Sequence, residues 1–264
     1  MSLKFFCYSF MRVRDVEEVV ADIEMIINAT RRFERKSSMM LFVFLPTPLI
    51  AMVAPRVDRA YVKLAAQDVS EPFAEEIAGE LSLARLRQIG ADMALAGSVD
   101  RRVVLQEDDR RIASKMASLL SSGLKSVLGV GEVVDAGSAE ELCCVSEGAA
   151  ADRLIENQIA AGFESVCEDA YLRMGVVYQP GWSIGSEGCS MPRDYVEARL
   201  EGIRRSLAKT VPNAPMDIPV FYGGRMDEDE AASYLSEGMF DGILVDDRQW
   251  DARSFCSVIE RVCG

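Results

Sequence analysis

Carboxylates are the residues best suited to chemistry in this chain, because histidine is absent. Asp246 and Asp247 follow a short apolar run, residues 242–245, that is predicted to form a strand. Such a pair can recognise a cationic or polyhydroxy ligand, stay solvated in a loop, or be neutralised by Arg225 or Arg248. Adjacent carboxylates also offer oxygen ligands to Mg²⁺ or Ca²⁺. No further ligands stand at suitable spacing, so we predict no metal site.

The absence of histidine excludes several catalytic centres within the chain: a Ser-His-Asp triad, a Cys-His dyad and a His-bound zinc site. The seven cysteines show no CxxC spacing, which is typical of reduced, buried thiols in a cytosolic protein. The N-terminal residues lack the pattern of a signal peptide. We therefore expect a cytoplasmic protein, and we expect no cofactor.

The charge balance argues against a nucleic-acid partner. The 264 residues include 29 Lys and Arg against 42 Asp and Glu, a net charge of −13, whereas phosphate neutralisation requires basic residues. The one basic cluster, Arg31, Arg32, Arg35 and Lys36, is interpreted as a solvated helix end. The most apolar window, residues 39–55, contains three prolines and is too short to span a bilayer. We expect no membrane partner.

Short apolar runs alternate with segments of helical periodicity along the chain. Strands are predicted over residues 5–8, 41–45, 61–66, 93–96, 126–130, 174–178, 218–222 and 242–245. Helices are predicted over residues 16–27 with Asp15 as N-cap, 112–120, about 139–162, 196–207 after Pro192, 227–237 and 255–262. No change of composition marks a linker. The pattern predicts an α/β fold, a single (β/α)8 TIM barrel over residues 1–264; periodicity alone leaves a doubly wound open sheet as the alternative.

Several predicted strand ends carry motifs that resemble those of the triosephosphate isomerase family. Residues 178–185 read Tyr-Gln-Pro-Gly-Trp-Ser-Ile-Gly, similar to the family's Tyr-Glu-Pro-Val-Trp-Ala-Ile-Gly. Four segments resemble further family motifs in the same order: Ala-Ala-Gln-Asp at 65–68, Gly-Glu-Leu-Ser at 79–82, Gly-Ser-Val-Asp-Arg-Arg at 97–102 and Gly-Val-Gly-Glu at 129–132. The ordered set covers nearly the whole chain, so the resemblance is specific.

The resemblance implies the interconversion of dihydroxyacetone phosphate and glyceraldehyde 3-phosphate. In the family a carboxylate base moves the proton, a neutral imidazole polarises the carbonyl and a lysine stabilises negative charge. The matching positions here hold Gln179 for the base, Ser98 for the imidazole and Arg12 for the lysine, with Phe10 in place of an asparagine. An amide cannot take a carbon-bound proton, and losing a general base costs about 10²–10⁴-fold in rate. We therefore expect little or no isomerase activity.

The resemblance also assigns the phosphate site and its supports. The binding positions are Gly185, Gly223, Gly224 and Arg225, with Asp246 and Asp247 at the family's paired glycines; the supporting positions are Glu80, Arg101 and Trp182. Carboxylates repel a phosphate dianion, so a phosphorylated triose is a poor fit. We expect instead an unknown small-molecule ligand at the barrel mouth.

Family members are dimers built by the loop after the third strand. Residues 70–79 occupy that place, with Ala78 where the family carries threonine, and we predict a homodimer.

The favoured hypothesis is a pseudoenzyme with a binding or regulatory role. Two alternatives stay open: an enzyme of changed specificity acting on a non-phosphorylated or cationic small molecule, and an isomerase with residual activity through another base. The substituted mouth is equally consistent with drift after loss of selection.

Overall fold

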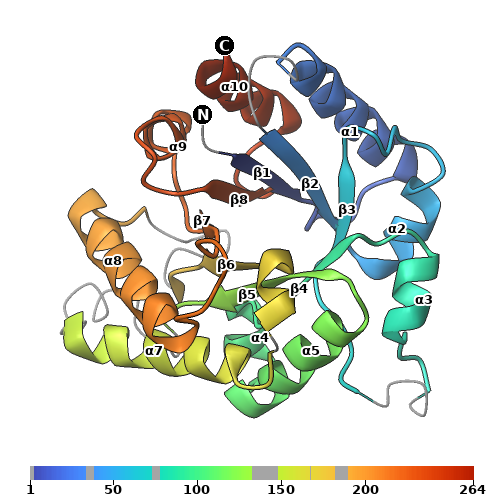
Figure 1. The fold of residues 1–264 in the computed structure, drawn as a ribbon. Helices are drawn as coiled ribbons and strands as arrows, with labels where there is room; N and C mark the ends of the chain where they lie inside the picture. Colours follow the sequence, from blue (N-terminus) through green and yellow to red (C-terminus); the bar gives the residue numbers. More distant parts are fainter. Residues whose placement is uncertain (1–2, 34–38, 73–77, 133–147, 167, 182–189) are drawn as a thin grey trace.

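Eight parallel strands close into a barrel in the order of the sequence (Figure 1). The computed structural model describes residues 3–33, 39–72, 78–132, 148–166, 168–181 and 190–264. The first strand pairs in parallel with the second on one side and with the eighth on the other, which closes the sheet and excludes an open one. The predicted (β/α)8 barrel is therefore confirmed.

The strands lie close to their predicted positions. They are β1 (Lys4–Ser9), β2 (Met39–Leu45), β3 (Lys63–Ala66), β4 (Met93–Ala96), β5 (Lys125–Val130), β6 (Met174–Tyr178), β7 (Val220–Tyr222) and β8 (Gly242–Asp246). The helices that cover them are α1 (Val16–Arg31), α2 (Thr47–Val53), α3 (Leu83–Gln88), α4 (Val99–Val104), α5 (Asp109–Ser121), α7 (Gly148–Phe163), α8 (Arg193–Thr210), α9 (Glu228–Ser236) and α10 (Ala252–Cys263), with a 3₁₀ helix, η2 (Glu168–Arg173).

Three short helices, α2, α3 and α4, were not predicted from the sequence. Each has only six or seven residues, too few for a 3.6-residue periodicity to be recognised. The predicted helix over 139–162 is found as α7, while residues 139–147 lie outside the described chain. Asp15 does occupy the N-cap position of α1, but its side chain makes no capping hydrogen bond.

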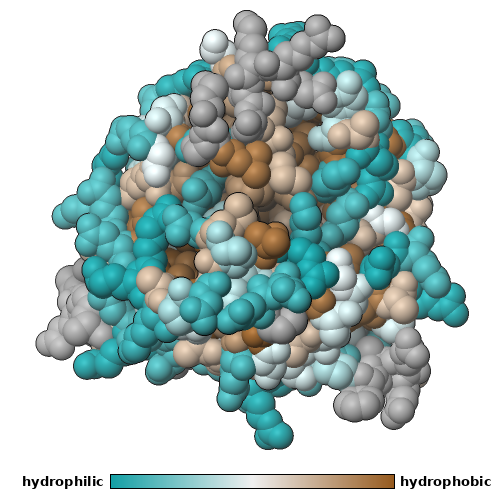
Figure 2. All heavy atoms as spheres, viewed as in Figure 1, coloured by the Kyte–Doolittle hydropathy of each residue, from teal (hydrophilic) through white to brown (hydrophobic). Residues whose placement is uncertain are grey.

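Side chains alternate between two apolar layers along the strands. One layer fills the barrel interior: Cys7, Phe42, Phe44, Ala65, Met93, Leu95, Val127, Val177, Phe221 and Leu244. The other layer packs outward against the ring of helices. Strands buried on both faces are expected in a parallel barrel. Figure 2, in the same view, shows hydrophilic residues over most of the outer helices and hydrophobic residues gathered toward the centre of the ring.

The charged residues at the end of α1 lie at the protein surface, as the sequence predicts for a solvated helix end. At the end of α1, Arg31 pairs with Asp58 and Arg32 pairs with Glu260, all exposed. This agrees with a solvated helix end for that part of the basic cluster; Arg35 and Lys36 lie outside the described residues. None of the helices in the described part of the chain is long and apolar enough to cross a membrane.

Candidate functional site

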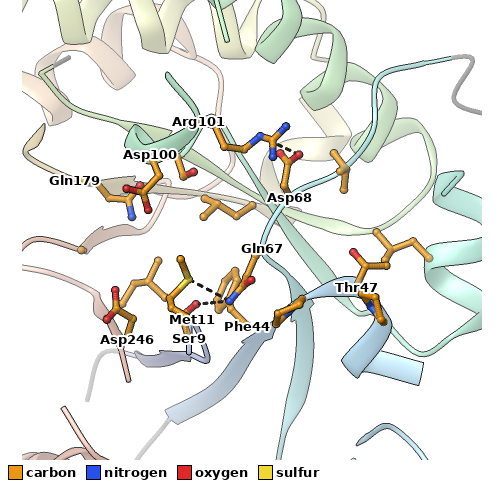
Figure 3. Close-up of a pocket in the computed structure, with 18 of the residues that line it drawn as sticks. Ser9, Met11, Phe44, Thr47, Gln67, Asp68, Asp100, Arg101, Gln179 and Asp246 are labelled. Atoms are coloured by element: carbon orange, nitrogen blue, oxygen red, sulfur yellow. Dashed lines mark hydrogen bonds and ion pairs between the residues drawn. The ribbon is translucent and has the colours of Figure 1, made fainter. Parts of the chain in front are cut away.

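The carboxyl ends of the strands surround a cavity of about 800 Å³. Figure 3 shows its lining side chains, which come from β1, β2 and β8, from α2 and α4, and from the loops after β1, β3 and β6. All parallel strands of a barrel end on the same side, so residues far apart in sequence meet there. This is the place where such barrels hold their ligands.

Gln179, at the base position of the resemblance, lines this cavity directly after β6. Its backbone N–H donates to the carbonyl of Val130 at 2.8 Å, and its side-chain Oε1 accepts from the N–H of Val99 at 3.3 Å. Glycine is required beside it: a Cβ at Gly131 would lie 1.9 Å from the Gln179 carbonyl oxygen, and one at Gly223 would lie 3.0 Å from its Cγ. The neighbouring glycines therefore fix where the amide stands.

Ser98, at the imidazole position, also lines the cavity. It occupies the N-cap of α4, but its hydroxyl makes no capping hydrogen bond. Gly97 before it has φ +76°, a left-handed conformation that favours glycine. The turn directs the side chain at 98 into the mouth, where a serine hydroxyl extends much less far than an imidazole.

Arg12, at the lysine position, is placed outside the mouth cavity. It lines a separate surface hollow with Arg14 and Asp251, and its guanidinium lies 3.4 Å from the carbonyl oxygen of Arg248. Met11 lines the mouth in its stead, while Phe10 is fully buried. The cation that the sequence places at this position therefore does not line the cavity that Gln179 and Ser98 share.

Asp247 turns away from the mouth and ties the loop after β8 to the loop after β1. It is 7% exposed, its carboxylate accepts the backbone N–H groups of Met11 at 2.8 Å and Arg12 at 3.0 Å, and its own N–H donates to the carbonyl of Ser9 at 3.0 Å. It lines the outer hollow instead of the mouth cavity. Asp247 therefore lies outside the mouth cavity and is not a solvated loop carboxylate, and its contacts hold the two loops together.

Removing the Asp247 carboxylate should lower stability measurably. We expect Asp247→Ala to lower the free energy of unfolding by about 1–3 kcal/mol, because two backbone donors lose a charged acceptor. Asp247→Asn should lose less, because one acceptor oxygen remains. Urea unfolding provides the measurement. Asp15→Ala is the control, an exposed aspartate without a capping bond, with an expected change within about 0.5 kcal/mol; equal losses in both alanine variants would contradict the assignment.

Asp246 does face the mouth, but it is neutralised. Its carboxylate accepts from the Arg248 guanidinium at 2.7 Å, and the same guanidinium lies 3.9 Å from Asp100. This is one of the alternatives that the sequence left open for this aspartate. Within the described chain, no group of three or more Cys, Asp or Glu side chains is arranged to hold a metal ion.

Asp100 is a lining carboxylate that the sequence did not single out. It lies at the start of α4, and Figure 3 shows it on the same side of the cavity as Gln179. Burial raises its pKa, although Arg248 opposes the rise. Its signal was present in the sequence, because it occupies the acidic position of the Gly-Ser-Val-Asp-Arg-Arg segment.

Of the other residues assigned from the resemblance, some line the cavity and some lie outside the described residues. Gly223, Gly224 and Arg225 all line the cavity, whereas Trp182 and Gly185 lie outside the described residues. Glu80 lines it too and accepts from the Ser70 hydroxyl. The ion pairs of Arg101 in the described chain are with other carboxylates, and Glu80 adds only a longer-range attraction.

Arg101 belongs to a four-member ion network at the wall of the cavity, which Arg101 and Asp68 line. Asp68 lies 3.0 Å from the Arg101 Nε and accepts from Lys115 Nζ at 3.0 Å with each oxygen. Glu107 accepts from the same lysine at 2.7 Å and from Arg101 Nε at 2.9 Å. Burial raises the pKa of Asp68; burial also opposes ionisation of Glu107, but the two cationic donors outweigh it and lower that pKa. The network fixes the side chain of Asp68, which lines the cavity.

Glu132, after β5, is a buried carboxylate that the sequence did not single out. It is 5% exposed and accepts from the hydroxyls of Tyr195 at 2.8 Å and Tyr178 at 3.1 Å. Burial raises its pKa, and the two hydroxyl donors only partly offset this. The folded protein therefore binds a proton at this site more readily than the unfolded chain does.

This raised pKa predicts a pH dependence of stability. The contribution of Glu132 is fully present below its ordinary pKa of about 4.5 and is lost as the pH rises through the higher folded value. We expect Glu132→Gln to remove that loss, so that the variant gains stability relative to wild type as the pH rises through the range above about 4.5. Urea unfolding across this range tests it, with the exposed Glu201→Gln as control; a constant difference between wild type and Glu132→Gln would be incompatible with it.

Comparison with known proteins identifies the family to which this barrel belongs. A family model for triosephosphate isomerase matches residues 14–262. Triosephosphate isomerases of Escherichia coli O1:K1 / APEC, of Escherichia coli strain K12 / DH10B and of Shigella boydii serotype 18 are each 28% identical over 240 residues, covering 90% of this chain and 89% of the relative. The chain belongs to the triosephosphate isomerase family. That membership agrees with the resemblance of its strand-end motifs and with the position of the cavity.

Proposed function

We propose that this member of the triosephosphate isomerase family does not isomerise triose phosphates and instead binds a small molecule at its barrel mouth, in a binding or regulatory role. The observation that carries the proposal is the amide of Gln179, which lines the cavity where the resemblance places the base. An amide has no basic pKa in the accessible range, so it cannot abstract a proton from carbon.

Three further features support the proposal. Ser98 offers a short hydroxyl where an imidazole would polarise the substrate. Arg12 lines a different hollow, so its charge is not directed at the cavity. Asp246 and Asp100 place two carboxylates at the mouth against the single guanidinium of Arg248, and this net negative group disfavours a phosphate dianion. We propose a non-phosphorylated ligand for these reasons.

We also propose that the protein acts as a cytoplasmic homodimer. The support for the dimer is the family resemblance of residues 70–79, of which 73–77 lie outside the described chain. Exposed apolar side chains on the loop after β1 are consistent with a partner surface, since Met11 is 38% and Val13 fully exposed. Light scattering of the purified protein measures the oligomeric state directly.

Asp100 favours one alternative function. It is a carboxylate in the mouth whose pKa is raised by burial, as general bases in enzymes commonly are. An enzyme of changed specificity, or a residual isomerase, would use it. Its proximity to Arg248 counts against that alternative, because the guanidinium opposes the rise in the pKa and so makes the Asp100 carboxylate a weaker base.

A coupled assay with glyceraldehyde 3-phosphate tests the proposal. Wild-type protein should show no turnover above a heat-killed control. Gln179→Ala and Asp100→Asn are assayed beside it. Turnover that disappears in Gln179→Ala would overturn the proposal, and turnover that disappears only in Asp100→Asn would establish the alternative.

A further inference from the structure

The mouth cavity holds a carboxylate, that of Asp100, which Arg248 only partly satisfies. Asp246 accepts from the Arg248 guanidinium at 2.7 Å and 3.2 Å and from the Arg248 backbone N–H at 2.9 Å. The same guanidinium lies 3.9 Å from Asp100, which is too far for a hydrogen bond. Within the described chain this is the one ion pair of Asp100. Arg248 is therefore committed to Asp246, and the Asp100 carboxylate lacks a close cationic donor among the described residues.

The charges around the cavity leave this group negative. The ion network of Arg101 is neutral, with two carboxylates and two cations. The other described lining charges are one of each sign, Glu80 and Arg225. Asp100 and Asp246 therefore stand against the single guanidinium of Arg248 with a net negative charge. Burial raises the pKa of Asp100, and the charge of Asp246 adds to the rise, as expected for a carboxylate with too little positive charge beside it.

The neighbours of Asp100 in the cavity are polar and uncharged. Ser98 and Gln179 line the same space, and a hydroxyl and an amide can both exchange hydrogen bonds with hydroxyl groups. In Figure 3, Asp100, Gln179 and Asp246 lie at the end of the cavity opposite Thr47. None of them belongs to residues 70–79, through which the proposed homodimer forms. The Asp100 side chain is 43% exposed, so a ligand in the mouth can reach it.

We propose that the strand-end part of the mouth binds a compact hydroxylated ammonium ion, with its ammonium group against Asp100 and its hydroxyl groups against Gln179 and Ser98. This rests on the proposed binding role of the same mouth and names its ligand class. An ammonium group carries three N–H donors, so it supplies Asp100 with the close contact that Arg248 gives only to Asp246. Such a ligand is opposite in charge to the triose phosphates.

Two compounds of the same size test this by NMR titration of isotope-labelled protein, at neutral pH and about 0.15 M salt to screen long-range attraction. Serinol has the three-carbon skeleton of glycerol, with an ammonium group in place of the central hydroxyl. Wild-type protein should bind serinol at least about fivefold more tightly than glycerol, equivalent to about 1 kcal/mol. Glycerol 3-phosphate, the anionic relative, should bind more weakly than glycerol.

Three variants locate the ammonium group. Asp100→Asn should bring serinol affinity to within about twofold of glycerol affinity, because the amide is uncharged. Asp217→Asn is the matched control: it removes the same charge from an exposed residue shortly before β7, at the opposite end of the barrel, and should leave serinol affinity within about twofold. Arg248→Gln should tighten serinol binding at least about threefold, because it removes a competing cation. A purely structural role of these residues would not produce that gain.

The outcomes separate this proposal from the proposed loss of activity. Equal wild-type affinity for serinol and glycerol, no serinol binding, or a serinol preference that survives Asp100→Asn would overturn the ammonium site and leave the loss of activity in place. Equal weakening by Asp217→Asn would identify attraction to the overall negative charge and would also overturn it. Isomerase turnover by a wild-type protein that prefers serinol through Asp100 would overturn the loss of activity and leave the ligand class intact. Circular dichroism confirms that each variant is folded.

Discussion

The double variant Gln179→Glu with Ser98→His should exchange the carbon-bound protons of dihydroxyacetone phosphate with solvent about 10²–10⁴-fold faster than wild-type protein, the range that a positioned general base contributes. Both side chains already line the same cavity. A glutamate at 179 can accept the same N–H of Val99 that Gln179 accepts at 3.3 Å. The new carboxylate would therefore stand where the amide stands, and the new imidazole would face the same space.

The single variant Ser98→His separates the two roles. Ser98→His alone should give no exchange above wild type, because an imidazole that polarises a carbonyl still needs a base to remove the proton. Deuterium uptake followed by proton NMR provides the measurement. Full family-like rates are not expected, because Arg12 does not line the cavity. Equal uptake in Ser98→His and in the double variant, or none in a folded double variant, would show that position 179 is not the base position.

Replacing Lys115 with methionine should lower the free energy of unfolding by about 3–5 kcal/mol, the cost of breaking a buried ion pair from one side. Lys115 is 2% exposed and binds both Asp68 and Glu107. Without it, two carboxylates in a buried setting share the single guanidinium of Arg101. Urea unfolding at neutral pH gives the value.

Two further variants identify the cause. Lys209→Met removes an ion pair with Glu156 whose lysine is 75% exposed, and it should cost less than about 1 kcal/mol. Adding Glu107→Gln to Lys115→Met should recover part of the loss, because it removes one of the unpaired charges. A Lys115→Met loss no larger than that of Lys209→Met would contradict the role of the network.

The strands were predictable because their signal is local. Runs such as residues 93–96 and 174–178 are apolar throughout, as strands buried on both faces must be, and both match β4 and β6 to the residue. The short helices α2 to α4 carry no such signal, since their positions are set by the strands and loops around them. The family motifs located the mouth because they lie at strand ends.

The directions of side chains at the mouth were not predictable. Asp246 and Asp247 are identical in type and adjacent, yet one faces the cavity and the other binds two backbone N–H groups of the loop after β1. Only the closure of the barrel between β8 and β1 creates that difference. Likewise, Lys115 stands next to Met116 on a buried helix face, and its partners come from segments up to 47 residues away. A single sequence does not contain those pairings.

The central claim is that no group of the mouth removes a proton from a triose phosphate. Wild-type protein incubated with dihydroxyacetone phosphate in D₂O tests it most directly, with the deuterium content of the substrate followed by NMR. The account predicts uptake at the rate of a protein-free control. Faster uptake by wild-type protein that is lost in Gln179→Ala or Asp100→Asn would contradict it.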